Sequence, residues 1–205
     1  MKIYLVLLIS ICPFVNTHAS SYNFVSNKSF YSFDNNNSSI KLKTKLKDAK
    51  VYCTKQHYNT DVCFLLDYSL PSGENRFFVC DMKNNTVLLS GLVAHGSCNT
   101  RFLKDAKFSN QIGCGCSSSG KYKTGQKYKG RFGTAYKLYG LEASNSNAFA
   151  RNVVLHSYSG VPEKEVAPLP ICNSLGCAMV STGFMKKLDK IISAYKRPIL
   201  LWIYE

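Results

Sequence analysis

The chain has 205 residues, of which 26 are lysine or arginine and 12 are aspartate or glutamate, so its formal net charge is +14. This length suits one domain with a substantial core, and no apolar run beyond the N-terminus is long enough to span a bilayer. The excess of positive charge favours anionic surfaces, such as nucleic acid, acidic lipid headgroups or a wall polymer rich in carboxylates.

The N-terminus predicts an export signal over residues 1–19. Lys2 supplies a basic start, residues 3–15 form an apolar run, and Ala19 offers a small residue before a cleavage site. The run is shorter than the roughly 20 residues of a membrane-spanning helix. We therefore expect cleavage and a periplasmic or otherwise exported location in the cell envelope, with an uncleaved anchor as the alternative. Export argues against a nucleic-acid partner.

A Ser/Asn- and Lys-rich leader is expected over residues 20–47, ahead of a single domain over residues 48–205. The low apolar content of the leader predicts a segment that cannot offset its own ordering entropy. Aromatic residues near its start could nevertheless dock on the domain. No internal repeat or second domain is visible.

From about residue 48, short β-branched or aromatic runs alternate with polar turns, which predicts a mainly β domain. The expected strands cover residues 51–53, 62–66, 76–80, 86–94, 135–138, 153–156 and 199–204. Glycine and serine over residues 113–133 indicate exposed loops flanking a hairpin, and a short helix is expected near residues 147–151.

One clear helix is expected directly after Cys177 and before Pro198. Its apolar residues recur at i, i+4, i+7, i+8 and i+11, as one face of an α-helix requires. They are Phe184, Leu188, Ile191, Ile192 and Tyr195.

The pattern richest in chemistry is His156 at a strand end, followed by Ser174-Leu175-Gly176-Cys177. An imidazole and a helix N-terminus both stabilise a thiolate, so Cys177 is a candidate nucleophile and His156 a candidate base. Gly176 suits a sharp turn, and the amides of Gly176 and Cys177 could donate to a developing oxyanion. The alternative is a buried cysteine beside a core histidine.

The chain has nine cysteines, and in an exported protein most of them are expected to form disulfides. A disulfide from Cys98 to Cys114 or Cys116 is the expectation. The alternative is a zinc site, because these three thiols and His95 would make a Cys₃His ligand set. Cys12 would leave with the export signal, so if Cys177 stays reduced, seven cysteines remain and at least one of them is unpaired, buried or intermolecular.

From residue 94 onward, many short segments resemble the murein L,D-transpeptidase catalytic domain family, in the variant with a His-Gly pair well upstream of the catalytic histidine. The matching segments are Ala94-His95-Gly96, Phe108-Ser109-Asn110, Ser117 to Tyr122, Tyr128-Lys129-Gly130, Leu138 to Glu142, Asn147 to Arg151, Val154-Leu155-His156 and Ser174 to Cys177. The resemblance implies a mainly β fold with α, an L,D-transpeptidase-like β-sandwich or barrel in which a helix follows the catalytic cysteine.

The resemblance implies that Cys177 is the nucleophile, His156 the base, and the Gly176 and Cys177 amides the oxyanion hole. The thiolate would attack a tetrapeptide stem of peptidoglycan at the L-centre of diaminopimelate and expel D-Ala. An amine of a second stem would then resolve the thioester into a 3→3 cross-link. No metal or organic cofactor is implied. The positive charge suits stems that bear several carboxylates, and association with an anionic envelope surface.

Further substrate contacts are expected from Ser174, Ser157, Arg151 and His95. Arg151 is a candidate because its guanidinium can bind a carboxylate bidentately, whereas His95 could shape the wall of the site. The chain departs from the family pattern where Leu175 stands for a frequent histidine and, two residues after the cysteine, where methionine stands for arginine.

Two other functions stay open. Water could serve as acceptor, which would make an L,D-carboxypeptidase or endopeptidase that trims murein. The chain could also be a non-catalytic, disulfide-stabilised envelope protein that binds murein, with Cys177 oxidised to another cysteine such as Cys172. Sortase-like and papain-like enzymes fit less well, because the former need an arginine soon after the cysteine and the latter place the cysteine before the histidine.

Overall fold

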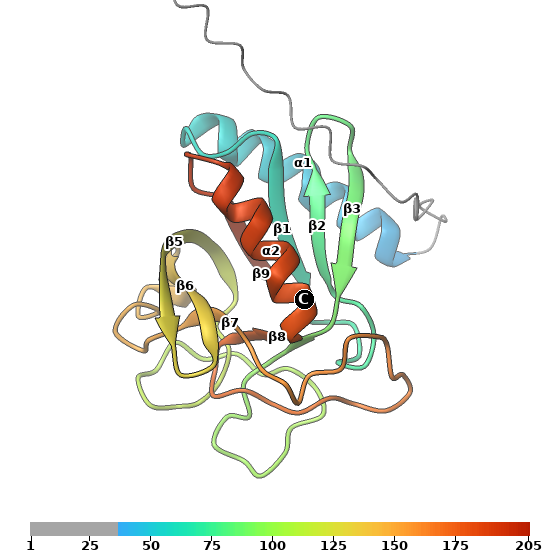
Figure 1. Ribbon diagram of the computed structural model, residues 1–205, viewed down its shortest axis with the longest axis vertical. Coiled ribbons are helices and arrows are strands. Elements are labelled where there is room, and N and C mark those ends of the chain that lie inside the picture. Colours follow the sequence, from blue (N-terminus) through green and yellow to red (C-terminus); the bar gives the residue numbers. More distant parts are fainter. Residues whose placement is uncertain (1–36) are drawn as a thin grey trace, which may run out of the picture.

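The computed structural model describes residues 37–205, so the expected export signal and the first part of the expected leader lie outside it. The elements are α1 (Asn37–Lys55), β1 (Val62–Asp67), β2 (Phe77–Asp81), β3 (Thr86–Gly91), β4 (Val93–Ala94), β5 (Gly120–Gly130), β6 (Gly133–Gly140), the 3₁₀ turn η1 (Ala143–Asn145), β7 (Val154–Ser157), β8 (Ala178–Val180), α2 (Thr182–Ala194) and β9 (Leu200–Tyr204). Figure 1 shows this mainly β domain with its two α-helices, which confirms the predicted fold class.

The nine strands of the described residues form one mixed sheet in the order β3-β2-β1-β9-β5-β6-β7-β8-β4. The pairs β1–β9 and β7–β8 are parallel, and the other neighbouring pairs are antiparallel. Strand β1 is buried along its whole length, as expected of a strand that is covered on both faces.

The two helices cover opposite faces of the sheet (Figure 1). Alternate residues of β1 enter different clusters, because successive side chains of a strand point to opposite faces. Phe64 and Leu66 pack with α2, whereas Cys63 and Leu65 pack with α1. Helix α2 buries Phe184, Met185 and Leu188, and α1 buries Leu42, Leu46, Ala49 and Cys53. Within residues 37–205, no helix has the length and hydropathy needed to cross a membrane.

Helix α1 crosses the boundary that the sequence predicted between a leader and a domain at residue 48. Residues 37–47 form its first part, and the strand expected over residues 51–53 is wrong because these residues are helical as well. The helix forms because its buried side chains, at i, i+4, i+7 and i+11, make one apolar stripe. Lys45 contributes from the side, with Nζ lying 4.5 Å from the centre of the Trp202 ring.

Two other local expectations were also wrong. The short helix near residues 147–151 is a series of turns, preceded by the 3₁₀ turn η1. Helix α2 does not begin directly after Cys177, because β8 lies between them and Ser181 caps the helix by accepting a hydrogen bond from Phe184 N. The apolar stripe predicted for α2 is correct, since its residues pack against the core.

Replacing Leu46 by alanine tests whether α1 is part of the domain core. Leu46 is 2 % exposed, so Leu46→Ala should lower the free energy of unfolding by about 2–4 kcal/mol. Val51→Ala is the matched control on the same helix, because Val51 is 64 % exposed and should change stability by less than about 0.5 kcal/mol. Urea unfolding followed by circular dichroism measures both. Equal stability of the two variants would show that α1 does not pack on the sheet.

Candidate active site

The parallel pairing of β7 and β8 brings together the two residues that the sequence singled out. Leu155 pairs with Ala178, and His156 pairs with Met179. Cys177 directly precedes β8, two residues before the partner of His156. With a rise of about 3.3 Å per residue and a strand spacing of about 4.8 Å, a residue at this position of an ideal strand would have its α-carbon roughly 8 Å from that of His156.

The imidazole of His156 is fixed by one hydrogen bond and one ring contact. Its Nδ1 lies 2.9 Å from Ser157 O, and because a carbonyl oxygen can only accept, Nδ1 carries the proton and Nε2 keeps its lone pair. Phe132 stacks on the ring at 5.5 Å between centres, and Ser157 Oγ donates to Phe132 O. Burial lowers the pKa of His156 below its ordinary value of 6.5, and the bond to Ser157 opposes this only partly.

Cys177 is a free, partly exposed thiol. Its Sγ–H donates to Asn152 O at 3.7 Å. Desolvation raises the pKa of Cys177 above the ordinary value of 9.0, whereas a backbone hydrogen bond from Val154 and the charges of Arg151 and Lys137 lower it. The thiol is therefore protonated at neutral pH, and its proton points at a backbone carbonyl.

The position of Cys177 in the fold removes one expected source of thiolate stabilisation. The sequence placed this cysteine at a helix N-terminus, where the helix dipole would lower its pKa. In the structure a strand follows it, and α2 starts only at Thr182. The positive side chains near Cys177 come instead from β6 and from the segment before β7.

Ser174 holds the turn that presents the thiol. Its Oγ donates to Cys177 O at 2.7 Å and accepts from Gly176 N at 3.1 Å, and its own N–H donates to His95 O. Gly176 has a φ of +109°, and a Cβ there would lie 2.6 Å from Cys116 O, so no other residue fits. The Gly176 amide already donates to Ser174, so an oxyanion contact from it would have to be shared.

Arg151 links the loop that precedes β5 to the turn at Gly176. Its guanidinium donates to the carbonyl oxygens of Ser109 and Cys116 and to Ser118 Oγ. A Cβ on Gly176 would lie 3.1 Å from its Nη2, so the guanidinium also borders the turn. The structure thus shows Arg151 bonded to protein acceptors, and the expected contact with a substrate carboxylate stays a prediction.

The cysteines of that loop form a disulfide between Cys98 and Cys116, one of the two pairings expected. Cys114 is a free thiol. The disulfide occupies two of the four donors of the alternative zinc set. Within residues 37–205, no group of three His, Cys, Asp or Glu side chains is placed to hold a metal ion.

His95 belongs to a buried network that includes Arg76, a residue that the sequence did not indicate. Arg76 donates to His95 Nδ1 at 2.8 Å and to Val93 O, and His95 Nε2 lies 3.1 Å from Leu103 O. Burial, followed by the charge of Arg76, lowers the pKa of His95 to about 4. His95 is therefore neutral and fully enclosed, which suits a support for the wall of the site.

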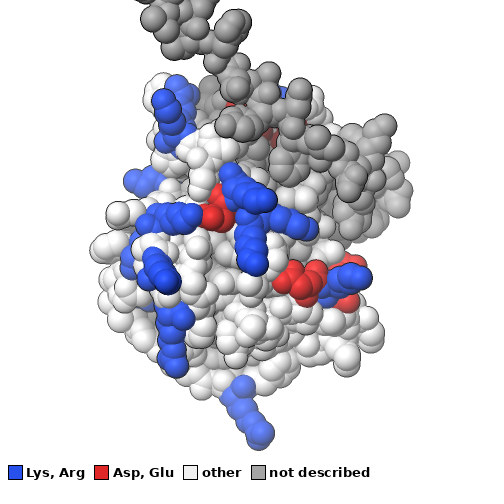
Figure 2. Space-filling model, in the orientation of Figure 1, with Lys and Arg blue, Asp and Glu red and all other residues white. Residues whose placement is uncertain are grey.

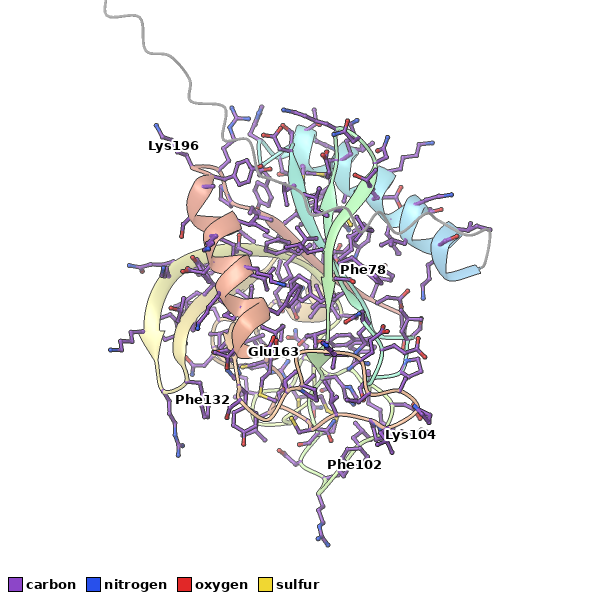
Figure 3. All side chains as sticks on the ribbon, turned by 45° about the vertical axis from the view of Figure 1, so that its right-hand side comes forward. Phe78, Phe102, Lys104, Phe132, Glu163 and Lys196 are labelled. Atoms are coloured by element: carbon purple, nitrogen blue, oxygen red, sulfur yellow. A yellow bond between two sulfur atoms is a disulfide. The ribbon has the colours of Figure 1, made fainter. Side chains whose placement is uncertain are left out.

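The loop between β7 and β8 is anchored at two carboxylates. Glu163 accepts from Ser181 Oγ and from Gly183 N, both at 2.6 Å, and Glu165 accepts from Asn75 N at 2.7 Å. Figure 3 shows Glu163 close to the first turn of α2. The Ser181 hydroxyl holds the pKa of Glu163 below its ordinary value of 4.5. The crossover that the parallel pair requires is thus tied to α2 and to the segment before β2.

The two positions where the chain departs from the family pattern lie in different surroundings. Leu175 is 77 % exposed, directly before Gly176 at the turn. Met179 is buried in a small hydrophobic cluster with Leu92 and Ile171. A charged side chain at position 179 would have to leave this cluster, so the methionine fits the local packing.

The structure is a mainly β domain with a histidine on β7 and a free cysteine directly before the neighbouring parallel strand β8. The family described as L,D-transpeptidase catalytic domain matches residues 32–204, and the chain belongs to that family. No curated protein sequence matches the chain.

Solved structures similar to this chain include three that differ widely from it in sequence. The helical cell shape determining protein Pgp2 from Campylobacter jejuni is 12 % identical, with a TM-score of 0.45 over 70 % of this chain and 47 % of that one. The Ldtfm–avibactam carbamoyl enzyme is 13 % identical, with a TM-score of 0.44 over 71 % and 49 %. An L,D-transpeptidase from Xylanimonas cellulosilytica is 12 % identical, with a TM-score of 0.39 over 75 % and 68 %. The chain spans about half the length of the first two proteins.

Replacing Phe132, whose ring stacks on His156, tests why the pKa of His156 is lowered. Phe132→Ala should raise the pKa of His156, because water would regain access to the imidazolium form. Phe102→Ala is the control, since Phe102 is similarly exposed but belongs to another loop (Figure 3). A pH titration of the imidazole nitrogens by NMR measures both variants. An unchanged pKa in Phe132→Ala would mean that other groups desolvate the ring.

Proposed function

We propose that this protein is an exported cysteine acyltransferase that acts on peptidoglycan stem peptides, with Cys177 as nucleophile and His156 as base. The observation that supports the proposal is the β7–β8 register, because the free thiol of Cys177 directly precedes the strand that pairs with the strand of His156. Membership of the L,D-transpeptidase family supports peptidoglycan as the substrate class. The net charge of +14 suits ligands that carry several carboxylates, and basic side chains predominate over acidic ones on the face shown in Figure 2.

The first step is proton transfer from Cys177 to Nε2 of His156. Nδ1 of the ring is fixed on Ser157 O, so only Nε2 can accept. The thiol proton, now directed at Asn152 O, has to turn towards the ring when substrate binds. Arg151 and Lys137 stabilise the thiolate that results.

The thiolate then attacks the carbonyl carbon of the L-centre of diaminopimelate in a tetrapeptide stem. The carbonyl oxygen becomes an oxyanion, for which the Cys177 amide is the proposed donor, with the Gly176 amide shared between it and Ser174. Collapse of this intermediate breaks the bond to the terminal D-Ala. The imidazolium of His156 gives its proton to the departing amine, which leaves a thioester on Cys177.

In the second step the amine of another stem attacks the thioester. His156 takes a proton from that amine, the C–S bond breaks, and the thiol is restored with a 3→3 cross-link in the product. Water in place of the amine would give a tripeptide and no cross-link, so the product distinguishes transfer from trimming. A non-catalytic protein with Cys177 paired to Cys172 is less well supported, because both are free thiols.

Product analysis with purified tetrapeptide muropeptides tests the proposed reaction. The wild-type chain should release D-Ala and form 3→3 dimers, whereas Cys177→Ser should lower the rate at least about 1,000-fold because the acyl-enzyme cannot form efficiently. His156→Gln should cost about 100- to 10,000-fold. Chromatography with mass spectrometry measures both products. Cys172→Ser is the matched control and should keep its activity.

Covalent trapping gives a second, independent test. A carbapenem should acylate Cys177 and add one drug mass to the wild-type protein, whereas Cys177→Ser should gain none. Cys172→Ser should still gain one mass, because Cys172 lies in the crossover loop outside the proposed site. Intact-mass spectra of folded, reduced protein that show no adduct on the wild-type chain would argue against a reactive Cys177.

A further inference from the structure

A row of alternating rings and amines runs along the β5–β6 hairpin. Its members, called here the hairpin ladder, are Tyr128, Lys137, Phe149, Tyr139 and Lys123. Lys137 Nζ lies 5.2 Å from the Tyr128 ring and 5.7 Å from the Phe149 ring. Phe149 stacks on Tyr139 at 5.4 Å with 10° between the ring planes, and Lys123 Nζ lies 5.0 Å from Tyr139.

The register of the hairpin places the ladder on the face opposite to α2. Lys123 pairs with Tyr139, and Tyr128 pairs with Ala135, so the ladder residues of β5 and β6 share one face. Side chains of the other face reach the helix, since Lys127 and Tyr136 both contact Asp189. The ladder is therefore not used to pack α2.

Gly125 of β5 leaves room for the Tyr139 ring of the ladder to pack against the sheet. It lies within the irregularity of β5 between residues 124 and 127, and a Cβ on it would come within 2.2 Å of the Tyr139 ring. The absence of a side chain at this position lets the ring lie flat over β5. Two contacts, with Gly125 and with Phe149, thus hold Tyr139 in place.

The amines of the ladder lack a carboxylate partner in the part of the chain that the structure describes. Within residues 37–205, no ion pair joins Lys123 or Lys137 to a carboxylate, whereas Lys121 and Lys127 of the same hairpin pair with Glu142 and Asp189. Lys123 and Tyr139 also line an open cavity of about 380 Å³, to which Lys196 and Arg197 contribute and no acidic residue does.

Lys137, near the Tyr128 end of the ladder, is connected to Cys177 through Asn152. Lys137 Nζ lies 3.5 Å from Asn152 Oδ1, and the backbone oxygen of the same asparagine accepts from Cys177 Sγ. The ladder is thus continuous with the proposed active site.

We propose that the hairpin ladder binds the donor strand of peptidoglycan, with its lysines on stem carboxylates and its rings against the apolar face of the adjoining sugar. This inference rests on the proposed function. The α-carbons of Lys123 and Lys137 lie roughly 8 Å apart by strand geometry. An extended peptide covers that distance in two to three residues, at about 3.3–3.6 Å each, so two carboxylates of one stem can reach both amines.

The test measures binding of a disaccharide–tetrapeptide muropeptide to the full chain carrying Cys177→Ser, which prevents turnover. Adding Lys123→Gln or Phe149→Ala should raise the Kd about five- to tenfold, because one charge-assisted contact or one ring contact is lost. Lys190→Gln on α2 and Phe102→Ala on the loop before β5 are the matched controls and should change the Kd less than about twofold. Isothermal titration calorimetry measures all four.

A disaccharide of N-acetylglucosamine, which carries no carboxylate, separates the two contacts: Lys123→Gln should leave its binding unchanged, whereas Phe149→Ala should weaken it. Equal muropeptide affinity of the ladder and control variants would overturn the proposal that the hairpin ladder binds the donor strand.

The same ladder variants are also made with Cys177 intact and tested for acylation by a carbapenem. This second measurement distinguishes failure of the proposed binding role from failure of the proposed reactivity of Cys177. If the variants are acylated normally but muropeptide affinity does not depend on the ladder residues, only the proposed binding role of the ladder is refuted. If affinity depends on the ladder residues but no acylation occurs, the binding role is supported and the proposed reactivity of Cys177 is refuted.

Discussion

The parallel pairing of β7 with β8 is the constraint on which the rest of the site depends. Residues 154–157 and 178–180 lie far apart in sequence, and their register alone brings Cys177 next to the strand of His156. A parallel pair needs a long crossover, here an irregular loop rather than a helix. Glu163 and Glu165 hold that loop, so its two ends cannot shift register without breaking these contacts.

The groups around this pair are fixed by hydrogen bonds to backbone atoms rather than by ion pairs. Arg151 joins the loop before β5 to the turn at Gly176, and Arg76 joins β4 to His95. The guanidinium of Arg76 is buried, which is costly unless its donors are satisfied, and here carbonyl oxygens and the His95 imidazole satisfy them. The half-buried guanidinium of Arg151 donates to two carbonyl oxygens and to the Ser118 hydroxyl. The site is therefore rigid on one side, while the hairpin ladder faces outward on the other.

Local sequence patterns identified β7, which carries His156, and the apolar stripe of α2, because alternation and i, i+4 spacing are local signals. Helix α1 was missed because its stripe, from Leu42 to Cys53, is diluted by lysines, so composition suggested a leader. Arg76 could not be foreseen, since its partner His95 is brought near only by the sheet. The strand after Cys177 was missed because three residues are too few for a periodic pattern.

The measurement that tests the account most directly is the pH dependence of Cys177 alkylation by iodoacetamide, followed by mapping the Cys177 peptide, in the wild type and in His156→Gln. If Nε2 takes the thiol proton as the sulfur reacts, the wild type should react faster than His156→Gln at neutral pH. The variant should react only above the ordinary thiol pKa of 9.0, because burial disfavours its unassisted thiolate. Superimposable profiles would contradict the account.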